Sequence, residues 1–312
     1  MPGVVFQWRG AKIGAAARPP NTVRSMTPPI IANAGPLLQR YDAVFCDVWG
    51  VLHDGRRAHP EAGEALARFR ADGGTVILVS NAPMPQEGVA DLLARLDVRR
   101  DAWDAIVSSG DIALHHVAEK GYRRLHQVGP RRRDYRLYVR LPESVALAEA
   151  EAIICTGLID DRNETVEDYL HLIETGVVRG LPFVCANPDL VVDVGSRRLP
   201  CAGSIAAEYE RRGGEVFWAG KPHPSAYATA LKRAALVRGR SPALPRVLGI
   251  GDAVRTDLAS ARGLGIDGLL IAGGIHDREL LRVGEIDVDG LVALFAPAGT
   301  PPAIGAMPRL RW

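Results

Sequence analysis

The chain of 312 residues contains no apolar run approaching the ~18 residues that span a bilayer, so we expect no transmembrane helix and no membrane partner. Residues 1–25 also lack the apolar core of a signal peptide. Cysteine is scarce, and the four residues present form no CxxC pair, which favours reduced, buried thiols over a disulfide framework or a thiolate metal site. Together these absences predict a cytoplasmic protein.

Positive and negative charges nearly balance over most of the chain. The net charge is +2, but residues 1–25 carry four basic and no acidic residues, which leaves 34 basic against 36 acidic residues in the remainder. This balance does not indicate a nucleic-acid-binding protein. We expect a flexible N-terminal extension at 1–35 and a disordered C-terminal tail at 296–312, where proline and small residues are frequent.

Lysine is rare as well, with four residues against 34 arginines. One of them, Lys221, lies in the segment WAGKPHPSAY, after an expected strand and before an expected helix with Pro224 near its first turn. In an arginine-rich chain, a lysine at that place indicates that a compact point charge is needed. An incidental surface lysine is the alternative.

Seven arginines are concentrated within 18 residues. They form either a solvated face, which is the commoner case, or a positive surface that attracts a phosphorylated ligand. These residues are Arg123, Arg124, Arg131, Arg132, Arg133, Arg136 and Arg140.

Apolar strands alternate with helices along the chain. We expect strands at 42–47, 75–80, 104–110, 246–252 and 267–273, with amphipathic helices between them. Continuous apolar strands joined by helices predict an α/β fold, a doubly wound parallel sheet that helices cover on both faces.

The middle of the chain carries its own set of strands and helices. We place it at 122–215 as a second α/β domain that is inserted into the first. The core domain is then discontinuous and consists of 36–121 and 216–295.

Three of the expected core strands end on polar residues, namely Asp47, Ser80 and Asp252. Ligands bind at the carboxyl ends of the strands in a doubly wound sheet. Turns recruit Asp and Ser for their own hydrogen bonds, but three apolar strands with such ends indicate a shared site. A further acid, Asp257, opens the helix after Asp252, where it either interacts with the helix dipole or orients a metal site.

These residue types suit phosphoryl transfer. A carboxylate attacks phosphorus to form an aspartyl phosphate, and oxygen ligands are those that Mg²⁺ prefers. A serine hydroxyl, loop N–H groups and a lysine offset the charge of the phosphoryl oxygens.

Four segments, DVWGV, VSNAP, GKPHP and GDAVRTD, follow one another in the order found in the haloacid dehalogenase superfamily of phosphohydrolases, which the chain resembles over about residues 40–275. The wide gap between the second and third segments, and the stretch 186–206, resemble class IIA of that superfamily. This class carries a large α/β cap of the C2 type and includes pyridoxal-phosphate, nucleotide and sugar-phosphate phosphatases. The resemblance implies a Rossmann-like core with an inserted cap.

The resemblance also implies roles in metal binding. Asp47 would be the nucleophile and an Mg²⁺ ligand. The backbone carbonyl of Trp49 and the side chain of Asp252 would be further ligands, and Asp257 would support the metal site without binding the ion.

Phosphate and substrate contacts follow from the same resemblance. Ser80 and Lys221 would bind the phosphate, with Asn81 beside them. The cap would close over the substrate with a loop that contains Asp189, Val191, Val192 and Asp193.

One position departs from the family's pattern. A second aspartate usually follows the nucleophile by two residues, protonates the leaving oxygen and later activates water; here Trp49 occupies that position. Tryptophan keeps the carbonyl but cannot transfer a proton, and general acid–base catalysis is worth about 10²–10⁴-fold. The nearest candidates for a relocated acid are His53 and Asp54, although a turn histidine without a catalytic role is the commoner case.

Two hypotheses therefore stand. The first is an Mg²⁺-dependent phosphatase that hydrolyses a small phosphorylated metabolite through an aspartyl phosphate, with activity attenuated by Trp49 or with a relocated acid. The second is a phospho-metabolite-binding protein of the same fold without catalysis. The presence of Asp47 favours the enzyme, since a binding protein needs no nucleophile. The resemblance also implies a homodimer that pairs through the cap.

Overall fold

The computed structural model describes residues 27–194 and 197–312. Most of the expected N-terminal extension lies outside these residues. Within them, no helix has both the length and the apolar character needed to cross a membrane.

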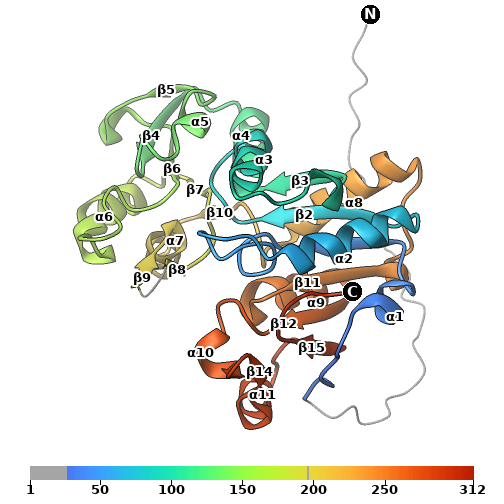
Figure 1. Cartoon of the computed structure of the whole chain (residues 1–312). Helices are drawn as coiled ribbons and strands as arrows, with labels where there is room; N and C mark the ends of the chain where they lie inside the picture. The colour runs from blue at the N-terminus through green and yellow to red at the C-terminus, as the bar shows by residue number, and fades with distance from the viewer. Residues whose placement is uncertain (1–26, 195–196) are drawn as a thin grey trace, which may run out of the picture.

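The larger sheet has six parallel strands in the order β15-β12-β11-β1-β2-β3 (Figure 1). Helices connect most of these strands, so the predicted doubly wound α/β fold is confirmed. The strands are β1 (Ala43–Cys46), β2 (Thr75–Ser80), β3 (Ala105–Ser108), β11 (Val247–Gly251), β12 (Asp267–Ile271) and β15 (Gly305–Met307).

Helices cover both faces of this sheet, which explains why its strands are apolar throughout. Val44 and Phe45, adjacent in β1, belong to different buried clusters because successive side chains point to opposite faces. One cluster includes residues of α2 (Pro60–Ala71) and α3 (Gln86–Arg95). The other includes residues of α4 (Ser109–Lys120), α8 (Pro224–Arg238) and α9 (Ala259–Leu264).

A second sheet of five strands lies in a separate lobe (Figure 1). Its strands, in the order β10-β7-β6-β4-β5, are β4 (Arg124–Val128), β5 (Glu143–Ser144), β6 (Ala152–Cys155), β7 (Phe183–Cys185) and β10 (Val216–Trp218). The helices α5 (Tyr135–Tyr138), α6 (Leu170–Val178) and α7 (Ala202–Arg211) belong to the same stretch of chain. We interpret this stretch as the inserted domain. Strand β10 extends its sheet beyond the expected boundary at residue 215.

The remaining elements are short. Two antiparallel hairpins are formed by β8 (Val191–Val194) with β9 (Arg197–Pro200), and by β13 (Leu281–Arg282) with β14 (Glu285–Ile286). The other α-helices are α1 (Gly35–Leu38), α10 (Asp277–Leu280) and α11 (Val288–Phe295). Short 3₁₀ turns lie at Arg100–Ala102, Leu147–Glu149, Val166–Tyr169 and Leu244–Arg246, and a π-helical turn at Val254–Leu258.

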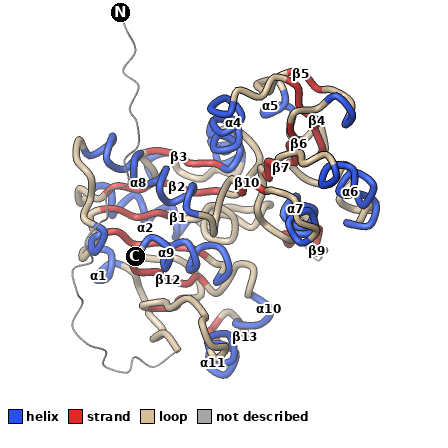
Figure 2. The backbone as a smooth tube through the Cα atoms, turned by 180° about the vertical axis from the view of Figure 1, so that it is seen from behind, coloured by secondary structure: helices blue, strands red, loops and turns tan. Residues whose placement is uncertain are grey.

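The two lobes share apolar packing. A single buried cluster contains Phe45 and Ile77 of the core sheet together with Ile154 and Val184 of the second sheet, and Val117 of α4 also belongs to it. The lobes are therefore packed against each other and not merely joined by two chain crossings. Figure 2 shows them side by side, with α4 and β10 at the place where they adjoin.

The prediction of a disordered tail at 296–312 is wrong for the segment that begins at Gly305. Strand β15 pairs with β12 as an edge strand of the core sheet, and Met307 and Leu310 are fully buried. The backbone N–H of Ala34 donates to the carbonyl of Arg311 at 2.8 Å. Pairing with residues distant in sequence creates this strand, whereas its proline-rich flanks resemble a linker.

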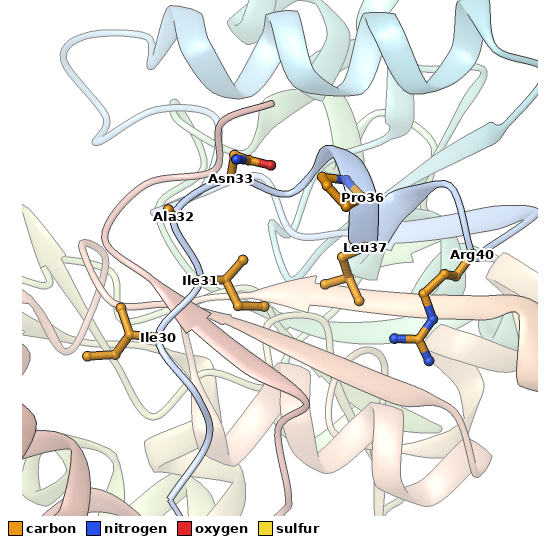
Figure 3. A pocket seen from close by; sticks show the side chains of 7 residues that line it. All are labelled: Ile30, Ile31, Ala32, Asn33, Pro36, Leu37 and Arg40. Carbon is orange, nitrogen blue, oxygen red and sulfur yellow. The ribbon is translucent and has the colours of Figure 1, made fainter.

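A shallow hollow lies beside α1 at the opposite end of the core sheet from the second lobe (Figures 1 and 3). None of its lining residues belongs to the predicted site. They are Ile30, Ile31, Ala32, Asn33, Pro36, Leu37 and Arg40 (Figure 3).

Burial of the C-terminal segment predicts a large effect on stability. Replacing fully buried Leu310 with alanine removes apolar contacts and leaves a cavity, so we expect Leu310→Ala to lower the free energy of unfolding by about 2–5 kcal/mol. The matched control is Leu236→Ala, because Leu236 is 75% exposed, and it should change this energy by less than about 0.5 kcal/mol. Urea unfolding measures both, and equal effects would contradict the packing of the tail.

Candidate active site

The three polar strand ends predicted from the sequence lie side by side. Strands β11, β1 and β2 are neighbours in the sheet, and all three run in parallel. Asp47 directly follows β1, Ser80 ends β2 and Asp252 directly follows β11. β2 follows β1 in the chain and lies on one side of it, whereas β11 comes after the inserted lobe and lies on the other side. These residues therefore lie at the topological switch point, where ligands bind in such sheets.

Lys221 lies at the centre of this group. Its Nζ is 2.5 Å from Oδ1 of Asp47 and 2.7 Å from Oδ1 of Asp257, and the residue is only 2% exposed. Burial acts to lower the pKa of Lys221, but the carboxylates of Asp257 and Asp47 outweigh it and raise the pKa well above its usual value. Lys221 is therefore a buried, protonated point charge and not an incidental surface lysine.

Three carboxylates surround the same space. Each of Asp47, Asp252 and Asp257 contributes one carboxylate oxygen, and these three oxygens lie within 4.8 Å of one another. Burial raises the pKa of Asp252 well above its usual value, and the nearby Asp47 and Asp257 raise it further. Backbone N–H groups hold two of the acids in place: Ile275 donates to Asp252 at 2.7 Å and Ala253 to Asp257 at 3.1 Å.

Two glycines make room for Asp252. A Cβ atom on Gly50 or on Gly274 would clash with the Asp252 carboxylate, and Gly50 also has a φ of +84°. Both chain segments thus approach the acid closely with backbone atoms. Gly50 could have been noticed from the sequence because it lies three positions after Asp47, whereas Gly274 lies 22 positions from Asp252 and gives no local signal.

Asn81 differs from its expected role beside the phosphate. Its Oδ1 accepts from the backbone N–H of Lys221 at 2.8 Å, and its Nδ2 donates to the carbonyl of Lys221 at 2.9 Å and to Oδ1 of Asp189 at 2.8 Å. The Oγ of Ser109 also donates to Oδ1, at 3.4 Å. With both amide protons engaged, the side chain has no donor left for a phosphate, and it positions the Lys221 peptide instead.

Trp49 and His53 pack against each other in the turn after β1. Their rings meet edge to face with centroids 5.1 Å apart, and a Cβ on Gly55 would clash with the indole. Burial lowers the pKa of His53 to about 4, and its Nδ1 accepts from the N–H of Gly55 at 2.9 Å. His53 is therefore neutral at pH 7 and fully buried, a state that disfavours it as a relocated acid.

The expected cap loop is only partly a loop. Asp189 lies in the loop before strand β8 and reaches the core through Asn81, as described above. Val191, Val192 and Asp193 belong to strand β8 of a hairpin, and Val191 and Val192 are half-buried. The side chain of Asp193 lies outside the described part of the structure.

Several arginines of the 123–140 cluster are paired with acids. Arg133 lies 2.6 Å from Asp161 within the second lobe. Two others connect the lobes, because Arg136 lies 2.5 Å from Asp91 and Arg140 lies 3.2 Å from Glu87. Both acids belong to α3 of the core (10 residues, Gln86–Arg95). These pairs favour a structural surface over an open phosphate-attracting patch.

All four cysteines are free and buried. Burial raises the pKa of each thiol above its usual value. They agree with the expected reduced, buried thiols, and none of them belongs to the acidic group around Lys221.

Known proteins resemble this chain, some over most of its length and one over a shorter stretch. A structure described as a hydrolase of the haloacid dehalogenase-like family from Brucella suis 1330 has 41% sequence identity and a TM-score of 0.78, and the match covers 90% of this chain and 100% of that one. The ribonucleotide monophosphatase NagD of Escherichia coli K12 is 24% identical over 268 residues, which is 84% of this chain and 96% of NagD. A dihydroxyacetone phosphatase of Corynebacterium glutamicum is 33% identical over 107 residues, covering 34% of this chain and 37% of that protein.

Sequence profiles of the family match two separate parts of the chain. The profile described as haloacid dehalogenase-like hydrolase matches residues 44–136, and the one described as HAD-hydrolase-like matches residues 218–294. The first match contains Asp47 and Ser80, and the second contains Lys221 and Asp252. The resemblance read from the four sequence segments is thereby confirmed, and the chain belongs to the haloacid dehalogenase-like hydrolases.

Proposed function

We propose that this enzyme is an Mg²⁺-dependent phosphatase that hydrolyses a small phosphomonoester through an aspartyl phosphate on Asp47. The observation that carries the proposal is the bond between the buried ammonium of Lys221 and the Asp47 carboxylate, within an acidic group at the carboxyl ends of the core strands. The names of two relatives, a ribonucleotide monophosphatase and a dihydroxyacetone phosphatase, support a small phosphorylated metabolite as substrate.

The charges of the site support a divalent cation. Three carboxylates face one ammonium, so the group carries an excess negative charge in a buried position, which is unfavourable unless a cation balances it. Carboxylate oxygens are the ligands that Mg²⁺ prefers, so the donor set fits this ion. Asp47, Asp252 and the carbonyl of Trp49 would hold it, and when bound it would neutralise charge on the phosphoryl oxygens.

Asp47 performs the first chemical step. One of its carboxylate oxygens attacks phosphorus, a new O–P bond forms, and the bond from phosphorus to the leaving oxygen breaks with its electron pair. Lys221 orients the nucleophile through the 2.5 Å contact and offsets charge on the transferred phosphoryl group, with the hydroxyl of Ser80. Asp257 holds the ammonium from its other side at 2.7 Å.

Hydrolysis of the aspartyl phosphate completes the cycle. Water attacks phosphorus, the O–P bond to Asp47 breaks, and inorganic phosphate leaves. Trp49 cannot supply a proton in either step, and its indole packs over Gly55 in the turn. We therefore propose that proton transfer to the leaving oxygen is weak, so that the rate depends on how readily the leaving group departs without a proton.

Release of phosphate over repeated turnovers distinguishes the proposed phosphatase from the second hypothesis, a binding protein without catalysis. A protein that only binds would require the lysine and the serine but no nucleophile next to them. Pairing of two chains through the cap stays a prediction of the family resemblance.

Loss of the nucleophile tests the covalent mechanism. Asp47→Asn keeps the size of the side chain but makes it a poor nucleophile and metal ligand, so we expect less than about a tenth of wild-type phosphate release. Asp42→Asn is the matched control, since Asp42 lies just before β1 at the other end of the strand, and it should retain activity. Phosphate release is measured across phosphorylated metabolites with Mg²⁺ and with chelator. A fully active Asp47→Asn variant would exclude the mechanism.

The close approach of Gly50 to Asp252 predicts an effect on metal binding. In Gly50→Ala the new methyl group would displace the Asp252 carboxylate, so the Mg²⁺ concentration for half-maximal activity should rise about tenfold or more. Gly73→Ala is the control, because Gly73 has a similar φ of +87° with nothing near its Cβ position. Backbone strain of roughly 1 kcal/mol is common to both variants. Equal Mg²⁺ dependence in the two variants would contradict the proposed role of Asp252.

The chemistry at Trp49 predicts a steep dependence on the leaving group. We expect p-nitrophenyl phosphate to be hydrolysed much faster than an alkyl phosphate, because an aryl oxide departs without a proton. Trp49→Asp should reduce this difference. His53→Gln should leave it unchanged, since His53 is buried and neutral. If wild type hydrolyses both substrates equally and His53→Gln abolishes only the alkyl activity, the acid has moved to His53.

A further inference from the structure

One of the contacts between the core and the inserted lobe is made by a side chain whose hydrogen-bonding groups are all engaged. The Asn81 amide bridges Oδ1 of Asp189, in the loop between β7 and β8, to both backbone polar groups of Lys221. Asn81 is 6% exposed and Lys221 is 2% exposed, so the contact is buried. A residue of the inserted lobe is thus linked through one amide to the peptide that carries the buried ammonium.

Close packing keeps the partners at this junction in register. Gly220 has a φ of +143°, and a Cβ on it would clash with Ser109, Asn81 and Pro188. On the other side, a Cβ on Gly203, in the first turn of α7, would clash with the carbonyl oxygens of Pro188 and Asp189. Two glycines therefore allow α7, the Pro188–Asp189 segment and the Lys221 loop to lie in direct contact.

The hydrogen bonds determine the orientation of the Asn81 amide. Its two protons point to Asp189 and to the Lys221 carbonyl, which leaves Oδ1 for the Lys221 N–H. Without an acceptor at Asp189, one amide proton would be buried and unpaired, which favours rotation of the amide away from the Lys221 peptide. That peptide then loses its support, and the position of Nζ between Asp47 and Asp257 loses precision.

We propose that Asp189 is a positioning residue that acts through Asn81: docking of the inserted lobe places the acceptor at Asp189, and this acceptor aligns Lys221 with Asp47. The inference rests on the proposed function, because the aligned lysine is the group that would neutralise the phosphoryl charge. It gives the inserted lobe a part in arranging the site in addition to covering it. A misplacement of about 1 Å at a reacting group costs up to about 10²-fold in rate.

An acceptor and a proton donor at position 189 are distinguishable by substitution. Asp189→Ala removes the acceptor, whereas Asp189→Asn keeps a carbonyl oxygen for the Asn81 amide and loses the carboxyl group. A positioning role predicts that the asparagine variant works and the alanine variant does not. Proton transfer by Asp189 predicts that both fail.

Lysine labelling measures the alignment without substrate or metal. The chain has four lysines, and Lys120 and Lys232 are exposed, so they serve as internal standards for acetylation followed by peptide mass spectrometry. In wild type we expect Lys221 to react at least about tenfold more slowly than these two. Asp189→Ala should raise the relative rate at Lys221 about tenfold, since one lost buried hydrogen bond is worth roughly that factor. Asp189→Asn should stay within about threefold of wild type.

Steady-state kinetics supply the second measurement. Asp189→Ala should lower kcat/KM by about 10- to 100-fold, and Asp189→Asn should restore most of it. Asp160→Ala and Asp160→Asn are matched controls on an exposed turn of the same lobe and should leave both readouts unchanged. If Asp189→Ala does not fold, Asp189→Ser replaces it, because the shorter side chain no longer reaches Asn81.

The outcomes separate the inference from the proposed function. Wild-type labelling at Lys221 in Asp189→Ala overturns the positioning role. Equal loss of activity in the alanine and asparagine variants with unchanged labelling also overturns it and assigns proton transfer to Asp189. If wild type hydrolyses no phosphomonoester, the proposed function fails, and the labelling result still decides whether Asp189 aligns Lys221.

Discussion

The site depends on one buried ammonium held between two carboxylates. A charged lysine that is almost inaccessible to water is stable only when opposite charges replace its hydration, and Asp47 and Asp257 do so at hydrogen-bonding distance. This requirement couples the end of β1, the turn after β11 and the loop before α8. The same ammonium holds Asp47 at 2.5 Å, an arrangement that suits the role of nucleophile proposed for this residue.

The topology makes the inserted lobe part of this arrangement. Its last strand, β10, ends at Trp218, and only Ala219 and Gly220 separate it from Lys221. The lysine is therefore positioned by the insert on its N-terminal side and by α8 on its C-terminal side. Asn81 adds a third support by bonding to its peptide, and shared apolar packing holds the lobes together. A displacement of the lobe would consequently change the position of Lys221 through the short backbone connection from β10.

Some features were predictable because they depend on local pattern. Asp47, Ser80 and Asp252 end continuous apolar strands, and parallel strands bring such ends to one edge, so their proximity followed from the order of elements. The final strand was missed because Gly305–Met307 has no strand pattern of its own and pairs only through tertiary contacts with β12 and with Ile30. The role of Asn81 was missed for a similar reason, since its partners lie 108 and 140 positions away.

The sequence by itself determined the fold class, the family and the identity of the chemical groups, because periodicity, strand-end residues and four ordered segments are all local signals. Only the tertiary structure decided which of these groups act together. It buried Lys221 between Asp47 and Asp257, enclosed His53 as a neutral ring, and engaged every amide proton of Asn81. Burial and hydrogen-bond partners depend on segments far apart in the chain, and they decide whether a side chain is charged, free or occupied.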